Sequence, residues 1–207
     1  MRLYYTPGTC SLATHIAARE ARIDVELVKV DLATKLTADG GRYAAINPLG
    51  YVPALVLDGG EVLTEASAVL QYLADIRPES GLLPAAGTFE RYVAQQWLAF
   101  VATELHKGFA PLWKKETPPD VRRQTVETLA TRFAFLDQHL AGRRFLLGER
   151  FSVADAYAFA VLGWARLMSI DLARWPNLTA FVERVEARPK VREALALEGL
   201  LPSAEAA

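Results

Sequence analysis

The spacing of apolar residues changes near residue 80, and this change limits the folds that the 207-residue chain can adopt. Ahead of that point, four short runs have the apolar and β-branched content of strands: 3–5, 25–30, 52–57 and 61–63. A helical pattern separates the first two runs, Asp58-Gly59-Gly60 predicts a hairpin between the last two, and Thr64 and Glu65 begin another helix. The order β-α-β, then β-β-α, predicts a parallel strand pair extended by an antiparallel strand.

The remainder of the chain carries almost no strand signal. Apolar residues fall on one helical face over 98–109 and again over 129–140. Ser152-Val153-Ala154-Asp155 has the spacing of a capping box, and the helix that it opens, to about Met168, is apolar on nearly every side. We expect that helix at the centre of a bundle. The sequence therefore predicts an α/β domain over 1–80, a Gly- and Pro-rich linker over 81–88 and an all-helical domain over 89–207.

Composition excludes several classes of protein. Hydrophobic residues make up 52% of the chain and charged residues 23%, which is a globular balance, and a net charge of −1 argues against a nucleic-acid partner. The single cysteine rules out an internal disulfide framework and suits a reducing compartment, and one cysteine with three scattered histidines offers no metal-ligand spacing. No apolar signal region follows Arg2 and no apolar run is long enough to span a membrane, so we expect a cytoplasmic protein.

The single cysteine, Cys10, falls where the first strand turns into the first helix. Thr6-Pro7-Gly8 has turn chemistry, and Thr9 is a suitable N-cap, which predicts Cys10 in the first helical turn. A thiolate at that position would be stabilised by the positive end of the helix dipole and would be reactive. The alternative is that Cys10 is a small buried apolar residue, as many cysteines are. The segment by itself leaves both interpretations open.

Several motifs together resemble those of the cytosolic glutathione transferases, and more narrowly the bacterial beta class. The motifs are residues 3–12 around Cys10, Asn47-Pro48-Leu49-Gly50-Tyr51-Val52-Pro53, Leu63-Thr64-Glu65, Glu104-Leu105-His106-Lys107-Gly108 and residues 151–156. The resemblance covers essentially the whole chain. It implies a thioredoxin-like N-terminal domain, an all-helical C-terminal domain and glutathione as co-substrate.

The resemblance also implies a glutathione site in the first domain. Pro53 matches the position of a cis proline, whose alternative is an ordinary turn proline, and the exposed N–H and C=O of Val52 would pair with the main chain of glutathione. Glu65 can accept the γ-glutamyl ammonium, while the N–H groups of Glu65 and Ala66 hold the carboxylate of the same group. Serine commonly follows this acid in relatives, so Ala66 removes a hydroxyl contact.

Two further residues match glutathione-binding positions of the family. Lys35 corresponds to a residue near the glycyl end of glutathione, although a loop lysine is also a common feature of solvated surface. Tyr5 corresponds to a tyrosine near the site, at the end of the first strand.

The second domain supplies a stripe of residues at i, i+4 and i+7, namely Ala99, Thr103 and His106. In beta-class relatives this stripe lines the cleft, so Thr103, Glu104 and His106 are expected to contact glutathione. Ala99 stands where asparagine is common, which removes one polar contact. His106 is a candidate proton donor or orienting group near Cys10, or else a structural histidine. Phe109 and Trp113 line an apolar pocket or belong to the core, and Asp155 caps its helix as a folding determinant.

The function implied by the resemblance is that of a detoxifying glutathione S-transferase. Such an enzyme conjugates the glutathione thiolate to small hydrophobic electrophiles, and the expected catalytic residues are Cys10, Ser11 and His106. The Ser11 hydroxyl and the N–H groups near residues 10–11 would stabilise the thiolate. By the same resemblance we expect a homodimer.

Two alternatives remain. Cys10-Ser11-Leu12-Ala13 lacks a second cysteine, so a glutathione-dependent thiol–disulfide oxidoreductase would have to work through a Cys10 mixed disulfide. The other alternative is a non-catalytic ligand-binding protein of the same fold, against which the set of Cys10, Val52-Pro53 and Glu65 argues. An apolar pocket accepts many small hydrophobic compounds, so the sequence does not identify the electrophile.

Overall fold

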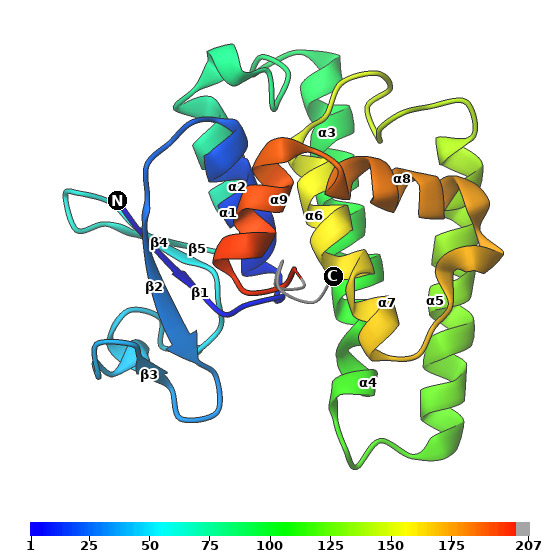
Figure 1. Cartoon of the computed structure of the whole chain (residues 1–207), viewed down its shortest axis with the longest axis horizontal. Helices are drawn as coiled ribbons and strands as arrows, with labels where there is room; N and C mark the ends of the chain where they lie inside the picture. Colours follow the sequence, from blue (N-terminus) through cyan, green and yellow to red (C-terminus); the bar gives the residue numbers. More distant parts are fainter. Residues whose placement is uncertain (202–207) are drawn as a thin grey trace, which may run out of the picture. The chain divides into compact units, whose positions relative to one another are not determined.

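The computed structural model describes residues 1–201 and divides into two compact units. The first unit contains Met1–Leu83 together with the segment that begins at Ala187, and the second unit contains Pro84–Glu186. Figure 1 follows the chain in colour, with the first unit in blue and cyan and its C-terminal segment in red. None of the helices in the described part of the chain is both long and apolar enough to cross a membrane.

A five-stranded sheet forms the centre of the first unit, in the order β3-β2-β1-β4-β5. The strands are β1 (Arg2–Tyr5), β2 (Glu26–Asp31), β3 (Leu36–Thr37), β4 (Ala54–Val56) and β5 (Val62–Thr64). Strand β1 pairs in parallel with β2 and antiparallel with β4, so Leu3 lies between Leu27 and Leu55. The predicted parallel pair, hairpin and thioredoxin-like fold class are therefore confirmed.

Three α-helices complete this unit: α1 (Ser11–Glu20), α2 (Ala66–Asp75) and α9 (Pro189–Leu197). Two 3₁₀ turns, η1 (Tyr43–Ala45) and η2 (Pro78–Ser80), lie in the connections. Helix α1 packs against both α2 and α9, and Ile16, Leu70 and Leu73 are fully buried. Residues 11–18 of α1 are all buried, as expected for a helix with neighbours on several sides.

Helix α9 belongs to the first unit, whereas the sequence placed every residue from 89 to 207 in the helical domain. Contacts with α1 hold this segment in the first unit, and no local sequence pattern predicts them. Arg188 forms a two-pronged ion pair with Glu20, at 2.7 and 2.8 Å, and Glu198 reaches His15 in the interior. The last residues of the expected domain, 202–207, lie outside the described part of the chain.

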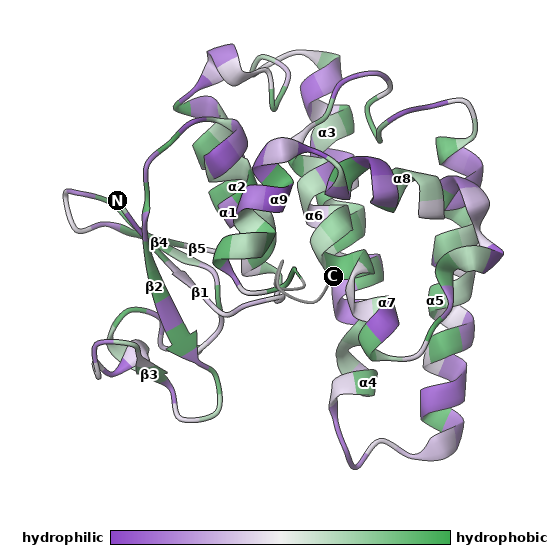
Figure 2. Cartoon of the chain, viewed as in Figure 1, coloured by the Kyte–Doolittle hydropathy of each residue, from purple (hydrophilic) through white to green (hydrophobic). Residues whose placement is uncertain are grey.

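The second unit is helical. Its α-helices are α3 (Phe89–Phe100), α4 (Ala110–Trp113), α5 (Pro119–Leu140), α6 (Val153–Leu162), α7 (Trp164–Leu167) and α8 (Pro176–Glu186). Between α3 and α4 lie a π-helical segment, η3 (Val101–His106), and a 3₁₀ turn, η4 (Lys107–Phe109), and η5 (Leu172–Arg174) precedes α8. All ten residues of α6 are buried, and its ribbon is mainly green in Figure 2, as expected for a central helix.

The N-terminus of α6 carries the predicted capping box. The Asp155 carboxylate accepts hydrogen bonds from the N–H and the hydroxyl of Ser152, at 2.8 and 2.7 Å, and from the N–H of Leu146 at 2.8 Å. Burial raises the pKa of Asp155 to about 6, although these donors act in the opposite direction. The helix ends at Leu162, earlier than the sequence predicted, and Gly163 separates it from α7.

Candidate active site

The loop between β1 and α1 holds the single thiol. The structure places the N-cap at Cys10, one residue later than the predicted cap Thr9, and α1 begins at Ser11. Cys10 is only 7% exposed, and its Sγ donates to the carbonyl oxygen of Val52 at 3.2 Å. This hydrogen bond requires the protonated thiol, because a thiolate has no proton to donate. Of the two interpretations that the sequence left open, a reactive thiolate and a small buried residue, the geometry of the free protein is that of a buried thiol.

The hydroxyl of Ser11 is directed into the same loop. Ser11 is fully buried, its Oγ lies 2.8 Å from the Thr9 hydroxyl, and it accepts from the Thr6 N–H at 3.2 Å. The Oγ also donates to the Thr6 carbonyl at 3.2 Å. These contacts tie the turn to the first residue of α1, so the Ser11 hydroxyl stabilises the loop that carries Cys10.

The Val52–Pro53 peptide bond is cis, in agreement with the position that the resemblance assigned to Pro53. The Val52 carbonyl, expected to be open, accepts the Cys10 thiol in the structure. The Val52 N–H finds no hydrogen-bond acceptor within the first unit as far as residue 201. A buried or half-buried main-chain donor without a partner is unusual, so this N–H is a candidate for pairing with a ligand.

The two residues before Val52 are also held by side chains. The Tyr51 carbonyl accepts from the Tyr43 hydroxyl at 2.7 Å and from the Asn47 amide at 2.8 Å. The Gly50 carbonyl accepts from the Lys35 ammonium at 2.9 Å. Lys35, expected near the glycyl end of glutathione, therefore lies against this loop.

Glu65 and Ala66 lie where β5 turns into α2. Glu65 is exposed, forms the N-cap of α2 without a side-chain cap and has a φ of +66°, which is uncommon for a residue with a side chain. Ala66 is buried and begins the helix. The first N–H groups of a helix have no partner within it, so this end of α2 offers donors together with an exposed carboxylate.

Tyr5 lies near a buried polar pair, Glu198 and His15, that the sequence did not predict. The Glu198 carboxylate contacts the His15 Nδ1 at 3.0 Å and accepts from the Gly8 N–H at 3.0 Å, and the side chains of both Glu198 and His15 are wholly buried. Burial, and then the charge of Glu198, raise the pKa of Tyr5 above its usual value. Glu198 thus fixes the turn before Cys10 from a position 190 residues away.

In the second unit, the expected stripe does not lie on a regular α-helix. The winding is π-helical over Val101–His106, so the i, i+4, i+7 spacing calculated for 3.6 residues per turn does not apply there. The Thr103 hydroxyl donates to the Ala99 carbonyl at 3.0 Å, and Glu104 pairs with Arg132 at 2.7 Å. Both side chains are therefore engaged within their own unit.

His106 contacts aromatic residues of the same unit. Its Nδ1 lies 2.7 Å from the Tyr157 hydroxyl, and its ring meets Trp164 edge-on at 4.9 Å. Burial, and then the charge of Lys107, lower the pKa of His106 to about 4. The imidazole is therefore neutral at pH 7, which is at odds with a role as a cationic proton donor.

The two candidate pocket residues have different environments. Phe109 is fully buried and packs edge-on against Trp164, so it belongs to the core. Trp113 packs against the same Trp164 at 5.5 Å but is 49% exposed, so about half of its surface is open to solvent.

Comparisons with known proteins show the family to which the chain belongs. The family model described as Glutathione S-transferase, N-terminal domain matches residues 8–76, and the model described as Glutathione S-transferase, C-terminal domain matches residues 100–189. The chain belongs to the glutathione S-transferase family. This confirms the family that the sequence motifs resembled.

Individual glutathione S-transferases match nearly the whole chain. The chain is 44% identical over 200 residues to Glutathione S-transferase GstA of Escherichia coli O157:H7, covering 97% of this chain and 100% of that protein. The structure of a sphingomonad glutathione S-transferase complexed with glutathione superimposes with a TM-score of 0.94 at 46% identity, covering 97% of this chain and 100% of that one. A bacterial beta class enzyme of Sphingomonas chungbukensis gives a TM-score of 0.94 at 42% identity, with the same coverage, which confirms the resemblance to that class.

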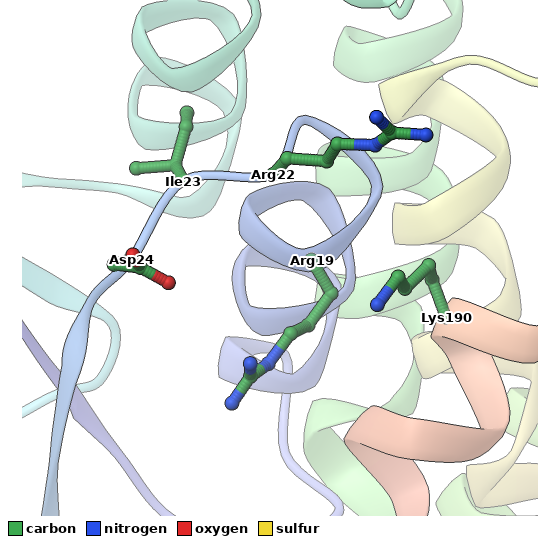
Figure 3. A pocket seen from close by; sticks show the side chains of 5 residues that line it. All are labelled: Arg19, Arg22, Ile23, Asp24 and Lys190. Atoms are coloured by element: carbon green, nitrogen blue, oxygen red, sulfur yellow. The ribbon is translucent and has the colours of Figure 1, made fainter.

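A separate hollow of about 270 Å³ lies at the end of α1 in this glutathione S-transferase chain. Arg19, Arg22, Ile23, Asp24 and Lys190 line it. Figure 3 shows the guanidinium groups of Arg19 and Arg22 pointing away from each other, and Arg19 and Lys190 both pair with Glu193. None of the expected glutathione-site residues lines this hollow, so it is not the candidate site.

Proposed function

We propose that the chain binds glutathione on its first unit and transfers the glutathione thiolate to electrophilic carbons of small apolar compounds. The observation that supports this proposal best is the unpartnered N–H of Val52, on the residue whose carbonyl accepts the Cys10 thiol. An extended peptide can pair with such a main-chain donor as a short added strand. Membership of the glutathione S-transferase family makes glutathione the peptide in question.

Charge complementarity supports the orientation of glutathione on this unit. The γ-glutamyl group carries an ammonium and a carboxylate on the same carbon, and the end of α2 offers the Glu65 carboxylate next to helix N–H donors. The glycyl carboxylate would then lie toward Lys35, whose ammonium can exchange its contact with Gly50 for the anion. Glu65 stands at the start of a helix and Lys35 on a loop, so we assign the larger share of binding to Glu65.

The chemical step requires a glutathione thiolate. Lowering the pKa of the bound thiol by about two units from about 8.5 raises the thiolate fraction at pH 7 from about 3% to about three quarters, at about 1.4 kcal/mol per unit. We assign this stabilisation to the N-terminal N–H groups of α1. Ser11 acts by holding the loop that carries Cys10.

A second candidate function rests on the position of Cys10. A Cys10 thiolate can attack the glutathione sulfur of a mixed disulfide between glutathione and a second thiol, forming a Cys10–glutathione disulfide and releasing the second thiol as its thiolate. A second glutathione then releases the protein thiol and forms glutathione disulfide. Because Sγ already donates to the Val52 carbonyl, this reaction needs the thiol to leave that contact, which disfavours it relative to conjugation.

We also propose a cytoplasmic homodimer. Phe89 and Tyr92, at the start of α3, are 78% and 61% exposed, which is apolar surface of the kind that a second copy can cover. Sedimentation at micromolar concentration should give about twice the 22.8 kDa mass of the chain, and a monomer mass would contradict the dimer.

Two turnover assays test the proposed function. We expect activity with glutathione and a halogenated aromatic electrophile, with little reduction of a glutathione mixed disulfide. Activity with the mixed disulfide alone would favour the oxidoreductase. Failure of the protein to bind glutathione at all would refute both functions.

A further inference from the structure

Three consecutive carbonyls, those of Gly50, Tyr51 and Val52, accept hydrogen bonds from side chains. The Tyr51 carbonyl differs from its neighbours because two donors converge on it, the Tyr43 hydroxyl at 2.7 Å and the Asn47 amide at 2.8 Å. A carbonyl oxygen has two lone pairs, so this oxygen is saturated. The peptide group can therefore rotate only by breaking two partly buried hydrogen bonds.

The direction of the Tyr51 carbonyl determines the direction of the Val52 N–H. Both belong to one planar peptide group, and in a trans peptide they point in opposite directions. The Tyr51–Val52 bond is trans, since among residues 1–201 only the next bond is cis. Two donors that hold the oxygen on one side consequently aim the unpartnered N–H toward the other side.

Both donors are themselves held in place. The Tyr43 side chain is fully buried and its ring packs against Tyr4 at 5.6 Å, so the core sets the position of the hydroxyl. Burial also raises the pKa of Tyr43, which keeps the hydroxyl protonated and able to donate. The Asn47 Oδ1 accepts from the Leu49 N–H at 3.1 Å, which orients the amide with its NH₂ group toward Tyr51.

We propose that Tyr43 and Asn47 are positioning residues that aim the Val52 N–H at the main chain of glutathione. The proposal rests on the proposed function, because it needs glutathione to pair with Val52. It assigns a binding role to a tyrosine that none of the sequence motifs contains and that does not itself touch the ligand.

Tyr43→Phe is the first test, because it removes the hydroxyl and keeps the ring in the core. Net loss of one hydrogen bond should weaken glutathione binding about fivefold by isothermal titration, and should raise the KM for glutathione by the same factor. The kcat and the KM for the electrophile should stay unchanged. Tyr4→Phe is the matched control: it removes a hydroxyl from the buried β1 ring that packs against Tyr43, and no hydrogen bond of Tyr4 reaches the loop in the described part of the chain.

Asn47→Asp is the second test and does not depend on the folding of the first variant. It keeps the acceptor for the Leu49 N–H but presents a carboxylate oxygen to the Tyr51 carbonyl, so repulsion replaces attraction. We expect at least a tenfold loss of glutathione affinity at pH 7.5.

An NMR readout separates this inference from the proposed function. In wild-type protein labelled with ¹⁵N-valine, the Val52 amide resonance should shift on addition of glutathione, and saturation should need about five times more glutathione in Tyr43→Phe. If wild type shows neither binding nor a shift, the proposed function fails. If wild type binds and shifts, but Tyr43→Phe and Asn47→Asp bind equally well, or Tyr4→Phe loses as much affinity as Tyr43→Phe, the positioning role is overturned.

Discussion

Protonation of His106 should destabilise the protein in mildly acidic solution. The ring is held by the Tyr157 hydroxyl at 2.7 Å and by the edge of Trp164 at 4.9 Å, and burial lowers its pKa to about 4. In the unfolded chain the same imidazole takes up a proton near pH 6.5. Between these two values the unfolded state binds more protons, so the free energy of unfolding falls as the pH falls.

The size of this loss of stability follows from the interval between the two pKa values of His106. Each pH unit between 6.5 and about 4 is worth about 1.4 kcal/mol, so the complete loss is about 3 kcal/mol. Above pH 6.5 both states hold the neutral ring and the contribution of His106 no longer changes. The loss should therefore begin near pH 6.5 and be almost complete near pH 4.

The assay compares urea unfolding of wild type and His106→Gln at one protein concentration, from pH 7.5 to pH 4.5. Glutamine keeps a hydrogen-bonding group for Tyr157 but does not titrate, so groups common to both proteins cancel in the difference. We expect the stability of wild type relative to the variant to fall by about 2–3 kcal/mol over this range. Parallel stability curves for the two proteins would refute the neutral, buried state of His106.

Three other predictions have defined outcomes. Glu65→Ala should weaken glutathione binding about tenfold or more and Lys35→Ala about threefold or less, measured by titration calorimetry, and the reverse order would contradict the assigned orientation of glutathione. Cys10→Ala should abolish the glutathione adduct that intact-mass spectrometry detects under mild oxidation, and should only partly reduce the rate of conjugation. Complete loss of conjugation in the folded variant would show that Cys10 is indispensable for conjugation. Asp155→Ala should lower the free energy of unfolding, measured in urea, by about 3–5 kcal/mol, because buried N–H donors lose their acceptor. The control Asp58→Ala removes an exposed carboxylate and should change this free energy little, and equal effects of the two substitutions would contradict the role of Asp155 as a helix cap.

The features that could be predicted from the sequence are those that depend on local patterns of residues. Short runs of apolar residues predicted the strands near Leu3 and Leu55, and the turn residues 58–60 predicted the hairpin that joins β4 to β5. Asp155 was found from the spacing of the capping box alone. In each case the pattern lies within a few consecutive residues, so a short stretch of sequence carries the information.

The features that could not be predicted depend on contacts that no local sequence pattern indicates. Glu198 meets His15 and Gly8 because α9 returns to α1, and no short motif encodes that return. Tyr43 acts on Tyr51 from a 3₁₀ turn that has no strong sequence signal, although Asn47 lay within a motif that the family resemblance singled out. In both cases the partner is defined by the fold and not by spacing.

The second unit shows a different limit of prediction from sequence, which concerns the winding of a helix. The pattern near His106 satisfied the period of an α-helix, but the chain winds as a π-helix there, and the local period cannot distinguish the two over six residues. The low pKa of His106 likewise depends on burial, which a single sequence does not report.

A crystal structure of the wild-type protein with glutathione tests the central claim most directly. We predict that the main chain of glutathione accepts a hydrogen bond from the Val52 N–H, with the γ-glutamyl group at Glu65 and Ala66 and the sulfur directed toward Cys10 at the start of α1. Glutathione bound elsewhere, with the Val52 N–H still unpartnered, would contradict the account.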